Sequence, residues 1–313
     1  MYEAFGLRIV SDFPLPELPI RCGGAYADLR IRRRELEGEW REKAPDPGRL
    51  VLSDGDAVWF RVPDTAVFRV SYGDEIVVSP LPGMDEDKAR LYVLGTCMAI
   101  LLLQRKLLPL HGSAIKIGGA AYAIVGDSGA GKSTLASLLL QEGHSLVSDD
   151  LIAVSFEPWS EREGPEIVPS YPQQKLWRDS LRLLDLEESG YRPLFERENK
   201  FAVPVPERFH AERLPFGGVF ELTAGDGVRV EARPLAGLEA IRALRRHTFR
   251  SFFVGMLGLQ AWHFDLSVRL AERVAMRRLS RPSAGYTAPQ LAEAIYTEIQ
   301  RRNRDAARDH ASC

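Results

Sequence analysis

The chain is poor in cysteine and has neither a long apolar run nor a strong excess of one charge. Its three cysteines, Cys22, Cys97 and Cys313, lack the spacing of metal ligands. Their odd number also does not suggest a set of disulfides, which fits a reducing compartment. The longest apolar run, residues 91–103, has 13 residues, whereas crossing a bilayer takes about 20. The first ten residues, MYEAFGLRIV, lack the basic and apolar regions of a signal peptide. These absences predict a soluble, cytoplasmic protein with no membrane partner.

The charge balance also narrows the choice of partners. A formal net charge of −2 over 313 residues gives no electrostatic reason to expect a nucleic acid. A hydrophobic fraction of 45% and a charged fraction of 27% are ordinary for a globular chain. This length allows one large or two modest domains.

Local patterns divide the chain into two parts. Residues 1–82 contain short β-branched and aromatic runs separated by turn residues, which predicts a small antiparallel sheet. That sheet is either a structural layer or a platform for a peptide. Residues 83–313 mix predicted strands with helices at 85–106, 235–246, 251–273 and 288–302, so the expected fold class is α/β. The polar stretch 158–215 is typical of a lid or substrate loop.

The most informative stretch is residues 126–133, GDSGAGKS, which fits the phosphate-loop pattern G-x-x-x-x-G-K-[ST]. An apolar run at 120–125 predicts a strand before it, and leucines spaced on one face predict a helix after it. Glycines let the backbone N–H groups turn inward to cradle phosphates, and the helix N-terminus adds partial positive charge. The alternative is a glycine turn that binds nothing.

We therefore predict a site for ATP and Mg²⁺. Lys132 is expected to reach the outer phosphates, and the Ser133 hydroxyl is expected to ligate Mg²⁺. The residues expected to bind the nucleotide are Gly126, Asp127, Ser128, Gly129, Ala130, Gly131, Lys132, Ser133 and Thr134.

Two adjacent carboxylates, Asp149 and Asp150, follow a short apolar strand 17 positions after Lys132. Phosphoryl transfer uses one carboxylate to hold Mg²⁺ and, in kinases, another to accept the proton of the acceptor hydroxyl. The residues leave open which aspartate has which role, and we take Ser133 and Asp150 as the working metal ligands. The alternative is a simple aspartate turn.

Three further residues are weaker candidates. His111 begins a predicted hairpin that folds back toward the loop, where it would either tune a carboxylate or form a structural hydrogen bond. Lys200 and Arg245 are tentative contacts for phosphate or substrate, although exposed cations are usually solvated.

Three separated elements carry a family resemblance: HGS at 111–113, GDSGAGKS at 126–133 and GHSLVSDD at 143–150. Their order and spacing resemble the catalytic core of HPr serine kinase/phosphorylase. The resemblance implies a core related to phosphoenolpyruvate carboxykinase, preceded here by a small β-rich domain, and it makes residues 83–313 the catalytic domain. It also implies ATP, Mg²⁺, a serine acceptor, an active-site role for His111 and assembly into a homo-oligomer.

The chain departs from that family in two places. No counterpart of the Glu-x-Arg-Gly-[Leu/Ile]-Gly signature, linked to phosphorylase activity, follows the core. The first eighty residues also differ from the family's N-terminal domain. The resemblance of the core therefore does not extend to dephosphorylation or to HPr as the substrate. As a whole, the chain resembles the HPr-kinase-like proteins of lasso-peptide gene clusters, through residues 2–18, YEAFGLRIVSDFPLPEL.

The function expected from this resemblance is an ATP-dependent serine kinase whose partner is a precursor peptide or small protein. The acceptor would be a serine near the C-terminus of a lasso (RiPP) precursor. The alternatives are a small-molecule hydroxyl kinase, an HPr-like protein kinase and a regulatory module that senses nucleotide without transferring phosphate.

Overall fold

The computed structural model describes residues 1–21, 23, 26–46, 48–156, 164–194 and 197–311. Cys22 and Cys313 lie outside the described residues, as does part of the stretch expected to form a lid. Cys97 is buried with a free thiol. Across the part of the chain that is described, no helix is both long and apolar enough to cross a membrane.

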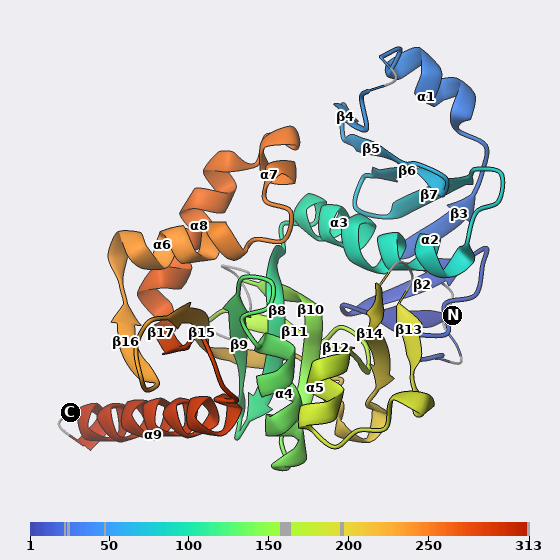
Figure 1. Cartoon of the computed structure of the whole chain (residues 1–313). Helices are drawn as coiled ribbons and strands as arrows, with labels where there is room; N and C mark the ends of the chain where they lie inside the picture. The colour runs from blue at the N-terminus through green and yellow to red at the C-terminus, as the bar shows by residue number, and fades with distance from the viewer. Residues whose placement is uncertain (22, 24–25, 47, 157–163, 195–196, 312–313) are drawn as a thin grey trace.

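The first part of the chain forms a seven-stranded sheet in the order β1-β2-β3-β7-β6-β5-β4 (Figure 1). The strands are β1 (Tyr2–Ala4), β2 (Leu7–Ser11), β3 (Leu29–Arg33), β4 (Val51–Asp54), β5 (Ala57–Val62), β6 (Ala66–Ser71) and β7 (Glu75–Pro80). β2, β3 and β7 run parallel, so the expected purely antiparallel sheet is wrong. The short helix α1 (Glu37–Lys43), which the sequence analysis did not predict, covers one face through buried Trp40.

The other face of this sheet packs on the helix that carries the long apolar run. The predicted helix at 85–106 is confirmed as α2 (Glu86–Tyr92), a π-helical turn (Val93–Cys97) and α3 (Met98–Gln104). The Asp85 side chain caps its start by accepting from the backbone N–H groups of Asp87 and Lys88. Because residues 98–103 are all buried, this segment is a core helix.

A second seven-stranded sheet has the order β11-β10-β8-β9-β15-β17-β16. Its strands are β8 (Leu108–Ile117), β9 (Ala120–Gly126), β10 (Ser145–Ser155), β11 (Glu166–Val168), β15 (Leu214–Gly225), β16 (Glu231–Leu235) and β17 (Ala275–Pro282). β9, β15 and β17 are parallel, so their carboxyl ends meet at one edge, where Gly126 pairs with Leu222 and Gly225 with Pro282. Ligands of α/β sheets bind at such an edge.

Helices cover both faces of the second sheet (Figure 1). One face packs on α4 (Lys132–Gln141) and α9 (Ala288–Ala311), and the other on α6 (Gly237–His247) and α8 (Gln260–Arg273). The predicted helix at 251–273 is two helices, α7 (Phe252–Met256) and α8, separated by Gly258 at φ +66°. The protein is thus a mixed α/β fold with several sheets.

The stretch 158–215 contains ordered structure in its described residues. β12 (Gln173–Trp177), β13 (Arg192–Leu194) and β14 (Arg197–Pro204) form a three-stranded sheet, joined by α5 (Arg178–Leu183) and the 3₁₀ turn Glu188–Gly190. A second 3₁₀ turn, Pro206–Arg208, leads toward β15. β12 lies beside α4 and β10, which places its side chains next to the predicted site (Figure 1).

The two large sheets share one hydrophobic cluster. It joins the inner face of the first sheet and α3 to Leu151 and Ala153 of β10 and to Phe253 of α7. The predicted boundary after residue 82 falls between β7 and α2, within this continuous packing.

Candidate functional site

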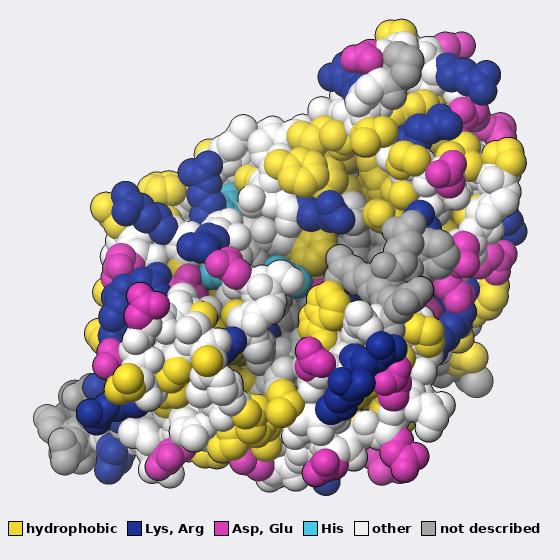
Figure 2. Space-filling model, viewed as in Figure 1, with side chains coloured by type: hydrophobic (Ala, Val, Ile, Leu, Met, Phe, Trp, Pro, Cys, Tyr) yellow, Lys and Arg dark blue, Asp and Glu magenta, His cyan; other side chains and the backbone are white. Residues whose placement is uncertain are grey.

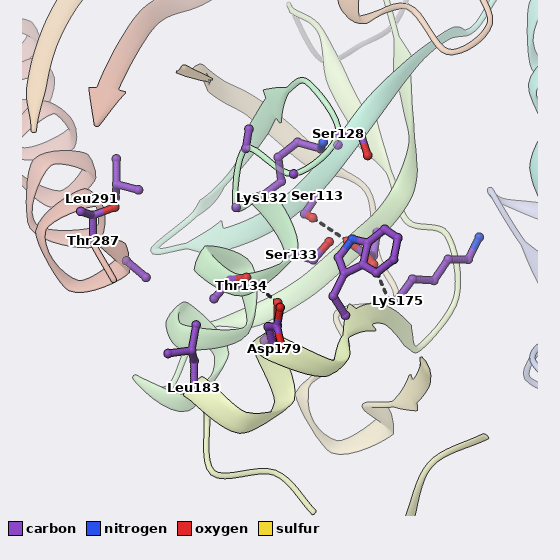
Figure 3. A pocket seen from close by; sticks show the side chains of 18 of the residues that line it. Ser113, Ser128, Lys132, Ser133, Thr134, Lys175, Asp179, Leu183, Thr287 and Leu291 are labelled. Carbon is purple, nitrogen blue, oxygen red and sulfur yellow. Dashed lines mark hydrogen bonds between the residues drawn. The ribbon is translucent and has the colours of Figure 1, made fainter. Parts of the chain in front are cut away.

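A cavity of about 480 Å³ lies at the carboxyl edge of β9, between α4, α5 and the start of α9 (Figure 3). Most of the predicted site residues line it. They are His111, Ser128, Gly129, Ala130, Gly131, Lys132, Ser133, Thr134, Asp149, Asp150 and Lys200. Gly126, Asp127 and Arg245 are not among the lining residues.

The predicted strand, glycine turn and helix are present as β9, residues 127–131 and α4. Gly129 and Gly131 have φ of +81° and +99°, values that side chains other than glycine rarely adopt. Gly126 has φ +153°, and a Cβ there would lie 2.7 Å from the carbonyl oxygen of Leu222 on β15. This glycine therefore lets β9 turn sharply away while it remains paired to its neighbour.

Lys132 is the first residue of α4, and its ammonium folds back over the loop. Nζ donates to the carbonyl oxygens of Gly126 at 2.9 Å and Asp127 at 3.0 Å. Burial lowers the pKa of Lys132, against the opposing pull of Asp149 and Asp150. The ammonium is thus held by neutral carbonyl groups, which a phosphate oxygen can replace with a stronger charge-assisted bond.

Two other loop residues make contacts that the sequence did not indicate. The Thr134 hydroxyl lies 2.7 Å from the Ser180 hydroxyl, which ties α4 to α5. The Asp127 carboxylate points to Arg246 of α6, with Nη2 of that arginine 2.5 Å from Oδ2. Asp127 therefore joins the loop to a neighbouring helix, whereas we expected it to bind the nucleotide.

Asp149 and Asp150 lie in the middle of β10, opposite Ser113 and Gly112 of β8. Neighbouring residues in a regular strand point to opposite faces. Asp150 has φ +67°, a left-handed conformation that breaks this alternation, and both aspartates line the same cavity. A Cβ on Gly112 would lie 2.3 Å from the carbonyl oxygen of Ile124, so glycine is required opposite Asp150.

The two carboxylates have different partners. Asp149 accepts from the Ser113 hydroxyl at 2.5 Å and from the backbone N–H of Lys175 at 2.7 Å. Asp150 accepts from the ammonium of Lys175, with Nζ 2.6 Å from Oδ2. Figure 3 shows Ser113 and Lys175, which come from β8 and β12, on the same side of the cavity.

Because their partners differ, the pKa values of Asp149 and Asp150 shift in opposite directions. Burial raises the pKa of Asp149 above that of an ordinary aspartate, and the hydrogen bonds from Ser113 and Lys175 only partly offset it. Burial acts in the same direction on Asp150, but the charges of Lys175 and Lys200 outweigh it and hold its pKa well below the usual range. Asp150 is therefore a fixed anion, and Asp149 is the more basic carboxylate.

His111 lies on β8, directly before Gly112, the residue that pairs with Asp150. Its Nδ1 lies 3.0 Å from the backbone oxygen of Asp150 and 3.7 Å from Oδ1 of the same residue. The ring of Phe249 contacts it edge-on at 5.6 Å between centroids. Burial lowers the pKa of His111 despite the charge of Asp150, which favours a neutral imidazole near pH 7.

The structure adds Lys175 and Arg281 to the candidate site. Lys175 lies on β12, and Arg281 on β17 donates from Nε to the carbonyl oxygen of Ala130 at 3.1 Å. Neither belongs to a local motif, because each reaches the cavity from a strand distant in sequence. A lysine within the polar stretch 158–215 carries no signal of its own.

The two tentative cations lie in different places. Lys200 on β14 lines the cavity, and its ammonium lies 5.5 Å from the centre of the Trp177 ring. Arg245 is exposed on α6 and does not line the cavity, so the structure does not support its predicted phosphate contact. Consecutive helical residues point about 100° apart, and it is the next residue, Arg246, that reaches the loop.

The cavity is polar at one end and apolar at the other. Lys132 and Ser133 lie on one side, while Leu183 of α5 and Leu291 of α9 lie on the other (Figure 3). Tyr286, just before α9, also lines the cavity. A ligand with charged groups at one end and a flat apolar group at the other fits this division.

The oxygen donors at the polar end suit a hard divalent cation. The Ser133 hydroxyl and the Asp150 carboxylate line the same cavity, and Mg²⁺ binds through one or two such groups together with substrate phosphates. Within the described ranges, no cluster of three or more His, Cys, Asp or Glu side chains forms an all-protein metal cage. The donor set therefore fits a cation that arrives with a nucleotide.

Comparison with known proteins gives a match over the same segment. Residues 105–165 match the family model for the HPr Serine kinase C-terminal domain. Over 70 residues the chain is 46% identical to an HPr kinase/phosphorylase of Mycoplasmopsis pulmonis, covering 22% of this chain and 23% of the relative. Over 163 residues it is 29% identical to one of Nitrosomonas europaea, covering 48% of each. These matches relate the chain to the HPr kinase/phosphorylase family.

The sequence similarity covers only part of this chain and of each relative. The chain spans about a quarter to a half of the length of these two relatives. Among solved structures, the HPr(Ser) kinase/phosphatase from Coxiella burnetii has a TM-score of 0.34 at 13% identity, covering 63% of this chain and 98% of that chain. The matched family segment begins just before β8 and includes the loop, α4 and the acidic pair.

Proposed function

We propose that this protein is an ATP-dependent phosphotransferase that phosphorylates a serine hydroxyl of a peptide or small protein. One observation carries the proposal. The same cavity is lined by a glycine loop, by a buried lysine and by two carboxylates whose pKa values are shifted in opposite directions. Phosphoryl transfer needs this combination of phosphate binding, charge neutralisation and a proton acceptor. The family match over residues 105–165 supports the same reaction class.

The polar end of the cavity holds the phosphates. Backbone N–H groups of the loop and the ammonium of Lys132 bind the outer phosphate oxygens, with Lys132 exchanging its carbonyl partners for them. The apolar end, at Leu183 and Leu291, takes the base. Ser133 and Asp150 would hold Mg²⁺, which neutralises charge on the phosphates when it is bound.

Asp149 is the proposed acceptor of the serine proton. Burial raises its pKa, which makes it a better base than Asp150, whose charge is fixed by Lys175. As the serine Oγ forms its bond to the γ-phosphorus, the bond from that phosphorus to the ADP oxygen breaks. The hydroxyl proton passes to Asp149, and Lys132 and Lys200 stabilise the charge on the moving phosphoryl group.

Within this class, the acceptor we favour is a lasso (RiPP) precursor peptide, phosphorylated near its C-terminus. The resemblance of residues 2–18 and of the core to kinases of such gene clusters supports it. The β-rich first part would serve as a structural layer or peptide platform, residues 83–313 would carry catalysis, and assembly into a homo-oligomer remains part of the proposal. A small-molecule hydroxyl kinase, an HPr-like protein kinase and a nucleotide-sensing module are the competing functions.

The test is transfer of the γ-phosphoryl group from labelled ATP to candidate acceptors, read by mass spectrometry. We expect a serine peptide to gain one phosphoryl mass and the Lys132→Ala variant to lose at least about a hundredfold in rate. Lys43→Ala is the matched control, because Lys43 pairs with Asp54 at the far side of the first sheet. Unchanged transfer by Lys132→Ala, or ATP binding without transfer to any hydroxyl, would reject the kinase assignment.

A further inference from the structure

The connection between α6 and α7 presents basic and aromatic side chains beside the mouth of the cavity. We define the connection face as Arg246, Phe249, Arg250 and Phe252. Arg246 and Arg250 are exposed, and Phe252 keeps 51% of its surface accessible. Figure 2 shows Lys and Arg side chains gathered over α6 and the end of α8, with a broad hydrophobic area near α7.

This face is continuous with the candidate site through two contacts. Arg246 bonds the Asp127 carboxylate at the start of the phosphate loop. Phe249 packs edge-on against His111, which in turn contacts Asp150, and the backbone N–H of Phe249 donates to Pro109 on β8. A chain lying on the connection face therefore reaches the acidic pair from the His111 side.

The charge of the face is strongly one-sided. Residues 237–251 contain four arginines and one glutamate. That glutamate, Glu239, is bound to Arg233 of β16, and Arg246 is paired with Asp127, so the positive charge of the connection face is centred on Arg250. The guanidinium of Arg250 lies over the ring of Phe249 at 6.0 Å, which holds the charge on an aromatic surface.

The backbone at Arg250 is also unusual. It adopts φ +47°, in the left-handed region that residues other than glycine rarely occupy. Such conformations persist where the surrounding structure fixes them, and they cluster at functional sites. The turn that follows presents Phe252 to solvent while it buries Phe253 in the shared core.

We propose that the connection face docks an acidic segment of the acceptor peptide, one that also carries an aromatic or aliphatic side chain. A carboxylate of that segment pairs with Arg250, a second shares Arg246 with Asp127, and the apolar side chain packs on Phe249 and Phe252. The acceptor serine is then directed past His111 to Asp149. This proposal rests on the proposed function and specifies its substrate class as an acidic peptide.

The test measures binding without catalysis, by fluorescence anisotropy of a labelled serine peptide rich in Asp, Glu and Phe. We expect Arg250→Glu to raise the dissociation constant at least about tenfold, and Arg250→Lys to change it less than about threefold. Raising the salt concentration should weaken binding to the parent more than binding to Arg250→Glu. Arg229→Glu, on the exposed β15–β16 connection, is the charge-matched control and should bind like the parent.

Several results would overturn the proposal. One is equal affinity for the acidic peptide and for a version with lysine at each acidic position. Another is an Arg250→Glu variant that binds the acidic peptide like the parent. A third is tighter binding of a single-stranded oligonucleotide than of the acidic peptide. A parallel measurement of ATP binding separates the two claims. Loss of peptide binding in Arg250→Glu with ATP affinity retained supports the dock, whether or not transfer to that peptide is efficient.

Discussion

The ammonium of Lys175 lies 2.6 Å from Oδ2 of Asp150, and the backbone N–H of the same lysine donates to Asp149. One residue of β12 thus orients both members of the acidic pair. Both side chains of the ion pair are largely removed from solvent, with relative side-chain exposures of 9% for Lys175 and 19% for Asp150. Breaking a buried pair by removing one partner leaves the other charge uncompensated.

We therefore expect Lys175→Met to lower the free energy of unfolding by about 3 kcal/mol, because methionine fills similar space without the charge. Urea denaturation of the purified protein measures this change. The double variant Lys175→Met/Asp150→Asn should recover much of the loss, since the orphaned carboxylate is gone. A Lys175→Met protein as stable as the parent would show that the pair contributes nothing to the fold.

Asp149→Asn should separate stability from activity. The asparagine can keep both hydrogen bonds, accepting from the backbone N–H of Lys175 and donating to the Ser113 hydroxyl, but it cannot take a proton. We expect transfer to fall at least about a hundredfold. Rapid-quench assays measure this loss, and Asp54→Asn is the matched control, because Asp54 pairs with Lys43 on the first sheet and does not line the cavity.

The same variant has a defined pH dependence. Because the folded pKa of Asp149 is raised, the carboxyl is neutral in both states below its ordinary pKa of about 3.9 and imposes no cost there. Above that pH the unfolded state ionises first, so the parent loses stability until the folded carboxyl ionises too. The melting temperature of Asp149→Asn should therefore exceed that of the parent at pH 7 and match it near pH 3. The reverse order at pH 7 would contradict the raised pKa.

Gly112→Ala tests the close packing opposite Asp150. The added Cβ would lie 2.3 Å from the carbonyl oxygen of Ile124, a contact that only movement of paired strands can relieve. We expect a loss of at least about 2 kcal/mol in unfolding free energy, measured by chemical denaturation. Gly119→Ala is the matched control in the same hairpin, since no heavy atom lies within 4 Å of its Cβ position. Equal stability of the two variants would argue against the strand packing described.

Leu183→Glu tests the apolar end of the cavity. A carboxylate there would face the base of the nucleotide, so we expect the dissociation constant for ATP to rise about tenfold or more, measured by calorimetry. Leu238→Glu is the control, because Leu238 is also an exposed leucine on a helix, at 67% against 50%, but it does not line the cavity. If both variants bind ATP like the parent, the base does not lie against Leu183.

The sequence predicted the parts of the site that lie within one local unit. The strand before residue 126, the glycine turn and the helix after it depend on short-range patterns, and all three are present. Asp149 and Asp150 could be related to the loop because they follow an apolar strand 17 positions after Lys132, and the family resemblance links the same elements. Lys175 and Arg281 could not be found in this way, because only strand pairing across the fold brings them to the cavity.

The fold shows the same division between local and long-range information. The apolar run at 91–103 predicted a buried helix, because composition alone settles that question. The parallel pairing of β3 with β2 and β7 depends on chain crossings that local patterns do not encode, and a small antiparallel sheet was expected instead. Helix α1 was missed because its seven residues include a single buried side chain, Trp40.

β10, the strand that carries the acidic pair, contributes side chains to two hydrophobic clusters. Leu151 and Ala153 pack with the first sheet and α3, while Ile152 and Val154 pack with α6 and α8. Loosening either side would therefore disturb the backbone directly after Asp150. The molecule should melt in one cooperative transition, and any partner that stiffens the first sheet would also hold Asp149 and Asp150 more firmly in place.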